Sequence, residues 1–326
     1  MHTRRHILAG LGAAAAARVT PAAAQDAFPD HPLRLVVPFP PGGTTDVFAR
    51  VFASRFGEAL GASVVVDNRG GAGGLIGGGE VNRARPDGYT LIFHSPTSGI
   101  AGPLTRRVPP YRPLEGFEHV AILGYTPMIL AVSPRLGVNT LPELVDLLRR
   151  QPGRHSYGSS GIGGVPHLTT ELFRARAGNL DIVHVPYRGA AGAIQDTIAG
   201  NVTFVVDTFA PLLPLHQGGQ LKVIAIFGEE RAAVAPEVPT AREAGFDVVM
   251  RNTNYLSAPP GTPADRLERL SAAARTVMGS PEMAAELARM AYVPVIGSTP
   301  ASARDFIAHE VTLWGSIIQA AHIEVE

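Results

Sequence analysis

Strand-length apolar runs alternate with segments of helical periodicity, and this alternation is the strongest constraint on the fold. Residues 33–39 show a buried-strand pattern, and residues 46–60 place apolar side chains at helical spacing before Gly61, a typical helix C-cap. A strand, a glycine-rich turn and a helix recur over 155–178, and a strand and a helix over 182–200. Repeated units of this kind indicate an α/β fold with a largely parallel sheet in each domain.

The chain length indicates two domains, since 326 residues exceed the roughly 100–200 residues of a typical domain. No linker of biased composition separates two halves of the chain. We therefore expect interleaved domains, with strands that cross between them, rather than domains joined end to end.

Four helix starts can be placed from capping patterns. Thr140 and Glu143 form a capping box before a helix that extends to Arg150. The other three starts share an N-cap hydroxyl followed by proline at the first helical position. These pairs are Thr262-Pro263, Ser280-Pro281 and Thr299-Pro300, the last opening a helix expected over 301–323.

The composition excludes several classes of function. The chain has equal numbers of acidic and basic residues, 28 of each. This balance argues against a nucleic-acid partner, because a protein needs a basic face to bind phosphates. The single lysine, Lys222, does not lie in a phosphate-binding P-loop. The absence of cysteine excludes thiol nucleophiles, iron–sulfur clusters and disulfides. His309-Glu310 begins a near match to a zinc motif, but Leu313 stands where the second histidine would be. We expect no cofactor and no metal.

The N-terminus has the pattern of an export signal. Arg4-Arg5 precedes a run of small apolar residues over 7–17, and Ala22-Ala23-Ala24 gives a cleavage site. The apolar run is too short to span a bilayer. We expect residues 1–24 to be a signal peptide, exported either by the general secretory route or by a twin-arginine route. Its removal would take three arginines and leave a slightly acidic mature chain; the alternative interpretation is a disordered alanine-rich tail.

Two glycine-rich segments join a strand to a helix, at 38–46 and at 157–167. Glycines let the backbone approach a ligand, and helix N-termini offer unpaired N–H groups to an anion. Two such loops could face each other across a cleft, although each could also be only a tight turn. The second loop is not a nucleophile elbow, because Ile162 stands where that motif requires glycine, and it lacks the dinucleotide-binding glycine pattern.

Further motifs appear in an order typical of one family. They are VPFPPGGTTD at 37–46, DNRGGAGG at 67–74, RPDGYTL at 85–91, GSSGIG at 158–163, HVPYRG at 184–189, EAG at 243–245 and APPGTP at 258–263. Together with the export signal, they span nearly the whole mature chain. The sequence resembles the Bug-type solute receptors of tripartite tricarboxylate transporters.

The resemblance implies a two-domain periplasmic-binding-protein (Venus-flytrap) fold, type II-like, with crossing strands and a ligand cleft between the domains. Residues 25–124 plus 250–326 would form domain 1, and residues 125–249 would form domain 2. The protein would be a periplasmic monomer that captures a small organic carboxylate and delivers it to a membrane permease of the tripartite tricarboxylate type.

The resemblance also implies the binding residues, largely through backbone amides. The first loop would contribute Phe39, Pro41, Gly43, Thr44, Thr45 and Asp46, and the second Ser159, Ser160, Gly161, Gly163 and His167. Tyr187, Arg188, Gly189, Ala190 and Asp207 would lie beside them. We expect Asp46 to cap its helix and orient the first loop, and His167 to support the second.

The sequence departs from the family pattern at 93–97 and 254–257. His94, Ser95 and Tyr255 lie in these segments and are candidates for contact with the distal end of the ligand. That end of the ligand could be aromatic or polar.

Two other functions remain open from sequence. A receptor that signals to a membrane sensor kinase would use the same cleft. A periplasmic hydrolase could pair Ser159 or Ser160 with His167, although the serines follow a glycine turn without an elbow and no orienting acid is apparent.

Overall fold

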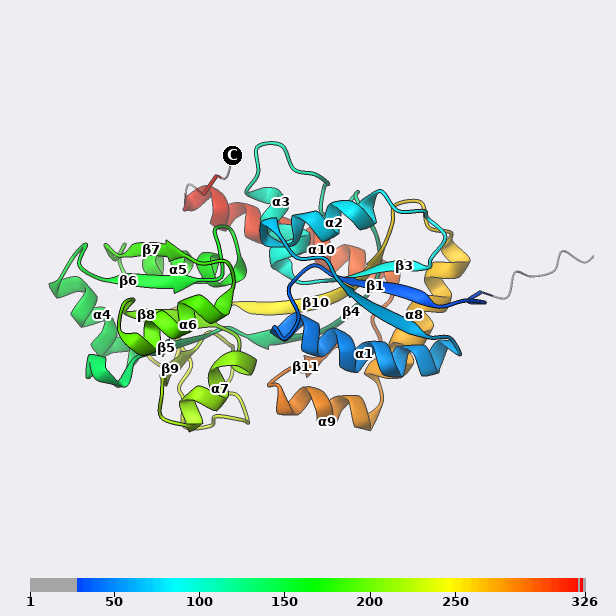
Figure 1. The fold of residues 1–326 in the computed structure, drawn as a ribbon. Coiled ribbons are helices and arrows are strands. Elements are labelled where there is room, and N and C mark those ends of the chain that lie inside the picture. The colour runs from blue at the N-terminus through cyan, green and yellow to red at the C-terminus, as the bar shows by residue number, and fades with distance from the viewer. Residues whose placement is uncertain (1–27, 322, 325–326) are drawn as a thin grey trace, which may run out of the picture.

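The computed structural model describes residues 28–321, 323 and 324. The predicted signal peptide lies outside the described residues. Figure 1 shows two lobes, each built around one β-sheet, with two long strands running between them. No helix in the described part of the chain is long and apolar enough to cross a bilayer.

The first lobe is built around a six-stranded sheet with the order β11-β4-β10-β3-β1-β2. Its strands are β1 (Leu33–Val37), β2 (Val64–Asn68), β3 (Thr90–His94), β4 (Glu118–Pro127), β10 (Arg251–Ala258) and β11 (Val293–Pro294). Its helices are α1 (Thr44–Leu60), η1 (Ala72–Gly74), α2 (Leu75–Asn82), η2 (Thr97–Ala101), α3 (Gly102–Leu104), α8 (Ala264–Met278), α9 (Pro281–Arg289) and α10 (Pro300–Ala320).

The second lobe is built around a five-stranded sheet with the order β7-β6-β8-β5-β9. Its strands are β5 (Ile129–Val132), β6 (Ser156–Ser159), β7 (Val183–Pro186), β8 (Phe204–Asp207) and β9 (Lys222–Ile226). Its helices are η3 (Pro134–Leu136), α4 (Leu141–Arg150), α5 (Val165–Arg176), α6 (Ala190–Ala199) and α7 (Phe209–Gln217).

The expectation of largely parallel sheets is wrong, because both sheets are mixed. β1 runs parallel to β2 and β3, and β6 runs parallel to β7 and β8. β10 runs antiparallel to β3 and β4, and β5 runs antiparallel to β8 and β9. The antiparallel strands are those at the crossing: β4 continues almost directly into β5, which lies antiparallel between β8 and β9 in the other sheet. β10 then returns beside β4.

Backbone hydrogen bonds tie the two strand crossings together. Met128 lies between β4 and β5, and its N–H donates to the carbonyl of Met250 at 3.0 Å. Phe227 donates to Met128, and Met250 donates to Phe227. Met128 is buried in a core cluster that extends from Ile122 in the first lobe to Leu130 in the second. The lobes are therefore joined through packed, hydrogen-bonded backbone.

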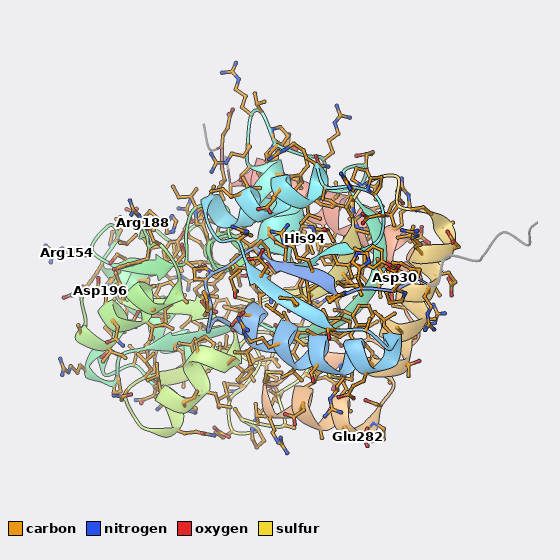
Figure 2. The ribbon with its side chains drawn as sticks, turned by 45° about the vertical axis from the view of Figure 1, so that its right-hand side comes forward. Asp30, His94, Arg154, Arg188, Asp196 and Glu282 are labelled. Atoms are coloured by element: carbon orange, nitrogen blue, oxygen red, sulfur yellow. The ribbon has the colours of Figure 1, made fainter. Side chains whose placement is uncertain are left out.

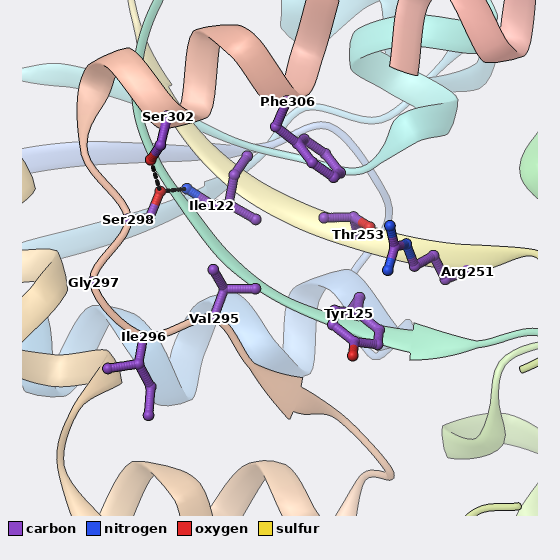
Figure 3. A pocket seen from close by; sticks show the side chains of 10 residues that line it. All are labelled: Ile122, Tyr125, Arg251, Thr253, Val295, Ile296, Gly297, Ser298, Ser302 and Phe306. Atoms are coloured by element: carbon purple, nitrogen blue, oxygen red, sulfur yellow. Dashed lines mark hydrogen bonds between the residues drawn. The ribbon is translucent and has the colours of Figure 1, made fainter. Parts of the chain in front are cut away.

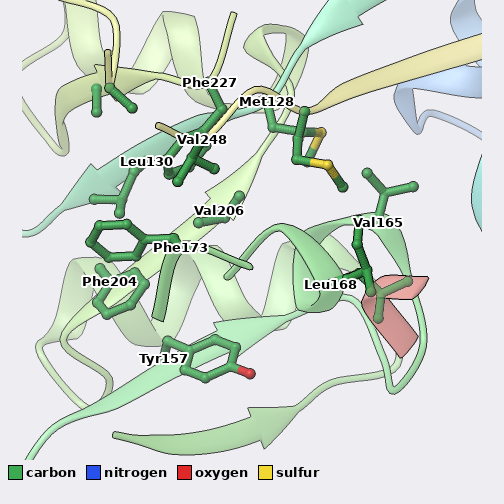
Figure 4. Packing of buried hydrophobic residues seen from close by; sticks show 14 of the residues in the cluster. Met128, Leu130, Tyr157, Val165, Leu168, Phe173, Phe204, Val206, Phe227 and Val248 are labelled. Carbon is green, nitrogen blue, oxygen red and sulfur yellow. The ribbon is translucent and has the colours of Figure 1, made fainter. Parts of the chain in front are cut away.

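Each lobe has its own aromatic core. Figure 4 shows Tyr157, Phe173 and Phe204 among aliphatic side chains of the second lobe. In the first lobe, Phe48 and Phe52 of α1 pack against Phe93 of β3. These cores fix the strands whose ends carry the candidate site.

Most capping predictions are confirmed. Gly61 ends α1 in the left-handed conformation, with φ of 73°, and the side chains of Thr140, Ser280 and Thr299 cap their helices. The prediction for Thr262 is wrong. Pro263 is the N-cap residue of α8, and the Thr262 hydroxyl instead donates to the carbonyl of Pro259 at 2.8 Å, closing the preceding turn.

Candidate functional site

The residues singled out from sequence lie mainly after the carboxyl ends of parallel strands. β1 leads into the first loop, β6 into the second, and β7 and β8 into the segments that begin at Tyr187 and Thr208. Parallel strands end at one edge of a sheet, and ligands of open α/β sheets bind beyond that edge. Each lobe therefore presents one such edge.

Two hydrogen bonds bring these edges together across the lobes. The Thr44 Oγ1 atom, at the start of α1, lies 2.9 Å from Thr208 Oγ1, which follows β8. The Val165 N–H, at the start of α5, donates to Thr97 Oγ1 of η2 at 3.1 Å. The first and second loops thus lie at the junction between the lobes.

Four helices begin at this junction without a side-chain cap from their own N-cap residue. Their N-cap residues are Gly43 for α1, Gly164 for α5, Gly189 for α6 and Thr208 for α7, and none of them accepts a capping hydrogen bond. Elsewhere side chains cap α4, α9 and α10, whereas α2, α3 and α8 have no side-chain cap either. These N-termini carry partial positive charge, and N–H groups without an intrahelical partner can bind an anion, so the junction is suited to one. In α5 the Val165 N–H is already taken by Thr97 Oγ1 and Pro166 has no N–H, so that helix offers fewer donors than the other three.

Asp46 organises the first loop from within α1. Its Oδ2 atom accepts the Gly42 N–H at 2.8 Å and Arg50 Nε at 3.1 Å, and Oδ1 accepts from Asn68 Nδ2 at 2.8 Å. Burial opposes ionisation of this carboxyl, but the hydrogen bonds from Arg50, Gly42 and Asn68 hold its pKa below the usual value. The prediction that Asp46 caps α1 is wrong, because Gly43 is the N-cap residue and α1 has no side-chain cap hydrogen bond. Asp46 orients the loop by holding the Gly42 amide.

Asn68 is a supporting residue that sequence analysis missed. Its Nδ2 atom also donates to the Phe39 carbonyl at 3.0 Å, so it holds both ends of the first loop. Its position could have indicated this role, because Asn68 ends β2, which runs parallel to β1 and so ends beside the first loop.

Histidines support the second loop. His167 Nδ1 accepts the Gly163 N–H at 3.0 Å, and Ser159 Oγ lies 2.6 Å from His184 Nε2. The two imidazole rings are stacked with their centroids 4.0 Å apart. Burial lowers the pKa of His167 to about 3 and that of His184 to about 4. Both rings are therefore neutral at neutral pH and act as hydrogen-bonding supports rather than as cations.

His184 could not be found by spacing along the chain, because β6 pairs it beside Tyr157 from the neighbouring strand β7. Its contact with Ser159 also bears on the hydrolase interpretation. Ser159 is hydrogen-bonded to His184 and not to His167, and within the described residues no carboxylate hydrogen-bonds to either imidazole. This arrangement lacks the orienting acid of a catalytic triad.

Arg188 supplies a cation beside the second loop. Its backbone is held there because the Tyr187 N–H donates to the Ser159 carbonyl at 3.0 Å. The guanidinium is exposed and makes no hydrogen bond or ion pair with any residue that the structure describes (Figure 2). The Ser160 hydroxyl likewise makes no hydrogen bond with any residue that the structure describes. Gly189 and Ala190 begin α6 directly after Arg188.

Asp207 ends β8 at the junction and is 8% exposed. Burial raises the pKa of this carboxyl to about 6, although the Thr208 N–H at 2.7 Å and the Thr208 hydroxyl at 3.3 Å favour the ionised form. Thr208 therefore contacts both Asp207 and Thr44.

His94 and Tyr255 lie in the interior of the first lobe. They are 0% and 1% exposed, they form a cross-strand pair between β3 and β10, and their ring centroids are 5.1 Å apart. His94 Nδ1 lies 3.1 Å from Ser98 Oγ. Ser95 is buried as well. His94, Ser95 and Tyr255 were the candidates for contact with the distal end of the ligand. In this conformation none of them reaches the surface, because η2 covers them.

The described residues contain no group of three or more His, Asp or Glu side chains that could hold a metal ion.

Comparisons with known proteins agree with this geometry. Residues 48–323 match the family described as "Tripartite tricarboxylate transporter family receptor". Protein BugT of Bordetella pertussis is 33% identical over 319 residues, which cover 97% of each chain. The solved structure of Rpa4515 from R. palustris with adipate is 31% identical, has a TM-score of 0.86 and covers 91% of this chain and 99% of its own.

A second solved structure, MatC from Rhodopseudomonas palustris with bound malate, is 28% identical with a TM-score of 0.82 and covers 89% of this chain and 100% of its own. These similarities confirm the two-lobed periplasmic-binding-protein fold. The matched proteins are solute receptors and not enzymes.

Proposed function

Because the chain belongs to the tripartite tricarboxylate transporter receptor family, we propose that it captures a small organic carboxylate between its lobes and delivers it to a permease of the tripartite tricarboxylate type. The structural neighbours with adipate and malate support a carboxylate ligand. The chain is a solute-binding protein, so binding and release, without covalent chemistry, make up its activity.

One observation carries the proposal: four helices, drawn from both lobes, begin at the junction without a side-chain cap from their own N-cap residue. Each exposed helix end stabilises a negative charge by about 0.3–1 kcal/mol, and more when partly buried. A slightly acidic mature chain cannot attract an anion through net charge. The N–H donors and Arg188 place positive potential where the ligand would bind.

The ligand carboxylate would contact the backbone of both loops. In this proposal one wall of the binding site consists of Phe39, Pro41, Gly43, Thr44 and Thr45. The other wall consists of Ser159, Ser160, Gly161 and Gly163. Arg188 would pair with a carboxylate, and Asp207 would face a hydroxyl or a protonated group, since a second carboxylate beside it would be repelled.

Binding would close the lobes. A ligand favours the closed state only by contacting both lobes. The moving units would be residues 25–124 plus 250–326 and residues 125–249, with the hinge near Met128 and Met250. We also propose that the chain is a monomer, exported to the periplasm by a signal at residues 1–24.

A thermal-shift panel on the mature protein tests the proposal. Adipate, malate, citrate and benzoate would be compared with 1,6-hexanediol, the neutral counterpart of adipate. A bound ligand raises the apparent stability by RT ln(1 + [L]/Kd). We expect at least one carboxylate to raise the melting temperature while the diol does not. A shift with the diol or a sugar, and with none of the carboxylates, would rule out a carboxylate receptor.

A further inference from the structure

The N-terminus of α5 is capped by a side chain from the opposite lobe. The Thr97 Oγ1 atom of η2 accepts the Val165 N–H at 3.1 Å, and Val165 is the first residue of α5. The Thr97 methyl group lies beside Gly164, the N-cap residue, where an added Cβ atom would be 3.6 Å from it. Glycine has no side chain with which to cap its own helix. The first lobe therefore supplies the cap that the second lobe lacks.

η2 presents Thr97 to the other lobe from a buried support. It is one turn of π-helix, a form that is rare and frequent at functional sites. Thr97 is half-buried, and the other four residues of η2 are buried. The Tyr111 hydroxyl donates to the Ser98 carbonyl, and Ser98 Oγ lies 3.1 Å from His94 Nδ1. Hydrogen bonds on both the backbone and the side chain of Ser98 thus fix the residue next to Thr97.

Close packing holds η2 from two further sides. A Cβ atom at Gly99 would lie 1.7 Å from the Tyr255 hydroxyl, so the η2 backbone rests directly on that ring. On another side α10 packs against η2. Ser298, just before α10, accepts the Ile122 N–H of β4 at 2.9 Å and so ties α10 to the sheet (Figure 3). η2 therefore has little room to move within the first lobe.

The far end of the same segment seats the second loop. Thr105 follows α3, and its hydroxyl donates to the Gly102 carbonyl at 2.9 Å. A Cβ atom at Gly163 would lie 2.8 Å from Thr105 Oγ1, so the second loop packs against this threonine. Thr97 and Thr105 thus contact neighbouring residues at the start of α5 from the two ends of one rigid segment.

We propose that Thr97 is a positioning residue for ligand binding, which caps α5 from the opposite lobe and holds the second loop against the first lobe. The inference rests on the proposed function, in which the ligand lies between the lobes. Because Thr97 and Val165 belong to different lobes, their hydrogen bond forms when the lobes meet. It adds to the closed state a contact that the ligand does not supply. His94 and Tyr255 then serve as the support beneath η2.

Calorimetry on three variants of the mature protein tests the role of Thr97. The probe is whichever of adipate, malate, citrate and benzoate raises the melting temperature most. Thr97→Val keeps the branched shape without the hydroxyl, and Thr97→Ser keeps the hydroxyl. Thr312→Val, on an exposed face of α10, is the matched control.

We expect binding to be about fivefold weaker in Thr97→Val, the effect of losing a threonine cap. Thr97→Ser and Thr312→Val should bind within about twofold of wild type, because the first retains the cap and the second never touched it. Unchanged affinity in Thr97→Val overturns the proposal. An equal loss in Thr97→Ser overturns it as well, since the hydroxyl would then not be the group that matters.

Hydrogen exchange of the Val165 amide tests the cap without any carboxylate. In the ligand-free protein, nuclear magnetic resonance should show several-fold faster exchange of this amide in Thr97→Val than in wild type. The Leu168 amide, which donates to the Gly164 carbonyl at 3.0 Å within α5, should not change. If no carboxylate of the panel binds, the proposed function fails and this amide still decides the inference. Equal Val165 exchange in the two proteins overturns it.

Tyr111→Phe tests whether η2 acts through Thr97. This variant loses the hydrogen bond to the Ser98 carbonyl and leaves Thr97 unchanged. Effects that pass through one shared contact do not add. We therefore expect Tyr111→Phe to weaken binding in the wild-type background and to add little in the Thr97→Val background. Fully additive losses would overturn the assignment of η2 as the support of Thr97. Urea midpoints of all variants separate a loss of affinity from a loss of folding.

Discussion

Thr44 Oγ1 and Thr208 Oγ1 lie 2.9 Å apart although 164 positions separate them in the sequence. This contact joins the first turn of α1 in one lobe to the start of α7 in the other. A hydrogen bond between two hydroxyls contributes only about 0.5–1.5 kcal/mol, so it can hold the lobes together and still break when they open. The contact lies among the helix starts that we assign to the ligand.

Removing this contact should weaken ligand binding without unfolding the protein. Thr44→Val keeps the branched side chain but loses the hydroxyl, so the closed state is less favoured. We expect the affinity for the best carboxylate of the thermal-shift panel to fall several-fold, about 0.5–1.5 kcal/mol, measured by calorimetry. Thr276→Val, on an exposed face of α8, is the control. Equal affinity in both variants would show that the contact plays no part in closure.

Arg188 should contribute to affinity but not to stability. Its guanidinium is exposed and unpaired within the described residues, so Arg188→Met should leave the urea midpoint unchanged. A charge-assisted hydrogen bond to a carboxylate contributes about 1.5–3 kcal/mol, so calorimetry should show at least tenfold weaker carboxylate binding and a smaller dependence on salt. Arg154→Met is the matched control, because Arg154 is also exposed and its side chain pairs with no described residue, and it should retain wild-type affinity. An unaltered Kd in Arg188→Met would place the ligand elsewhere.

Adjacent glycines in the second loop should respond differently to alanine. Gly163 has φ of 74°, and a Cβ atom there would lie 2.8 Å from Thr105 Oγ1. Gly164 has φ of −75°, and its nearest Cβ contact would be 3.4 Å. Gly163→Ala should therefore lose at least about 1 kcal/mol of stability from the left-handed backbone alone. Gly164→Ala should lose far less. Urea denaturation measures both, and equal losses would contradict the backbone conformation described here.

Buried histidines should make the fold less stable in mild acid. Burial lowers the pKa of His94 to about 3, of His119 to about 4 and of His167 to about 3, from 6.5. Between pH 6.5 and these values the unfolded chain binds protons that the native protein does not. Stability therefore falls as the pH falls, by up to about 1.4 kcal/mol per pH unit for each histidine.

Asp207 acts in the opposite direction, because its raised pKa makes the native state bind the extra proton below about pH 6. One acid offsets only part of the effect of three histidines. Urea midpoints at about pH 7 and about pH 5 should show the loss, and His94→Gln should reduce it. A midpoint that rises toward acid would contradict the buried, neutral state of these rings.

Local chemistry made much of the fold predictable. Gly61 and Gly200 end α1 and α6 where a left-handed residue is needed, and Thr140 and Ser280 supply cap hydroxyls. These signals depend only on residues a few positions apart. The glycine-rich helix starts at Gly43 and Gly164 were predictable for the same reason.

The features that sequence analysis missed depend on tertiary contacts. The antiparallel strand β10 pairs with β4 across more than a hundred residues, so no local pattern reveals the mixed sheets. His184 reaches Ser159 only through the register of β6 and β7. Pro214 lies inside α7, where proline normally argues against a helix. The burial of His94 and Tyr255 follows from the position of η2 over β3.

The most direct test of the central claim is to follow backbone amides during carboxylate binding. In the isotope-labelled mature protein, nuclear magnetic resonance would track the amides at 43–46, 160–165 and 189–190 as the best carboxylate of the panel is added. We predict that the largest shifts appear at these helix starts in both lobes and saturate at the calorimetric Kd. Shifts that are absent there, or confined to one lobe, would contradict a carboxylate held between the two loops.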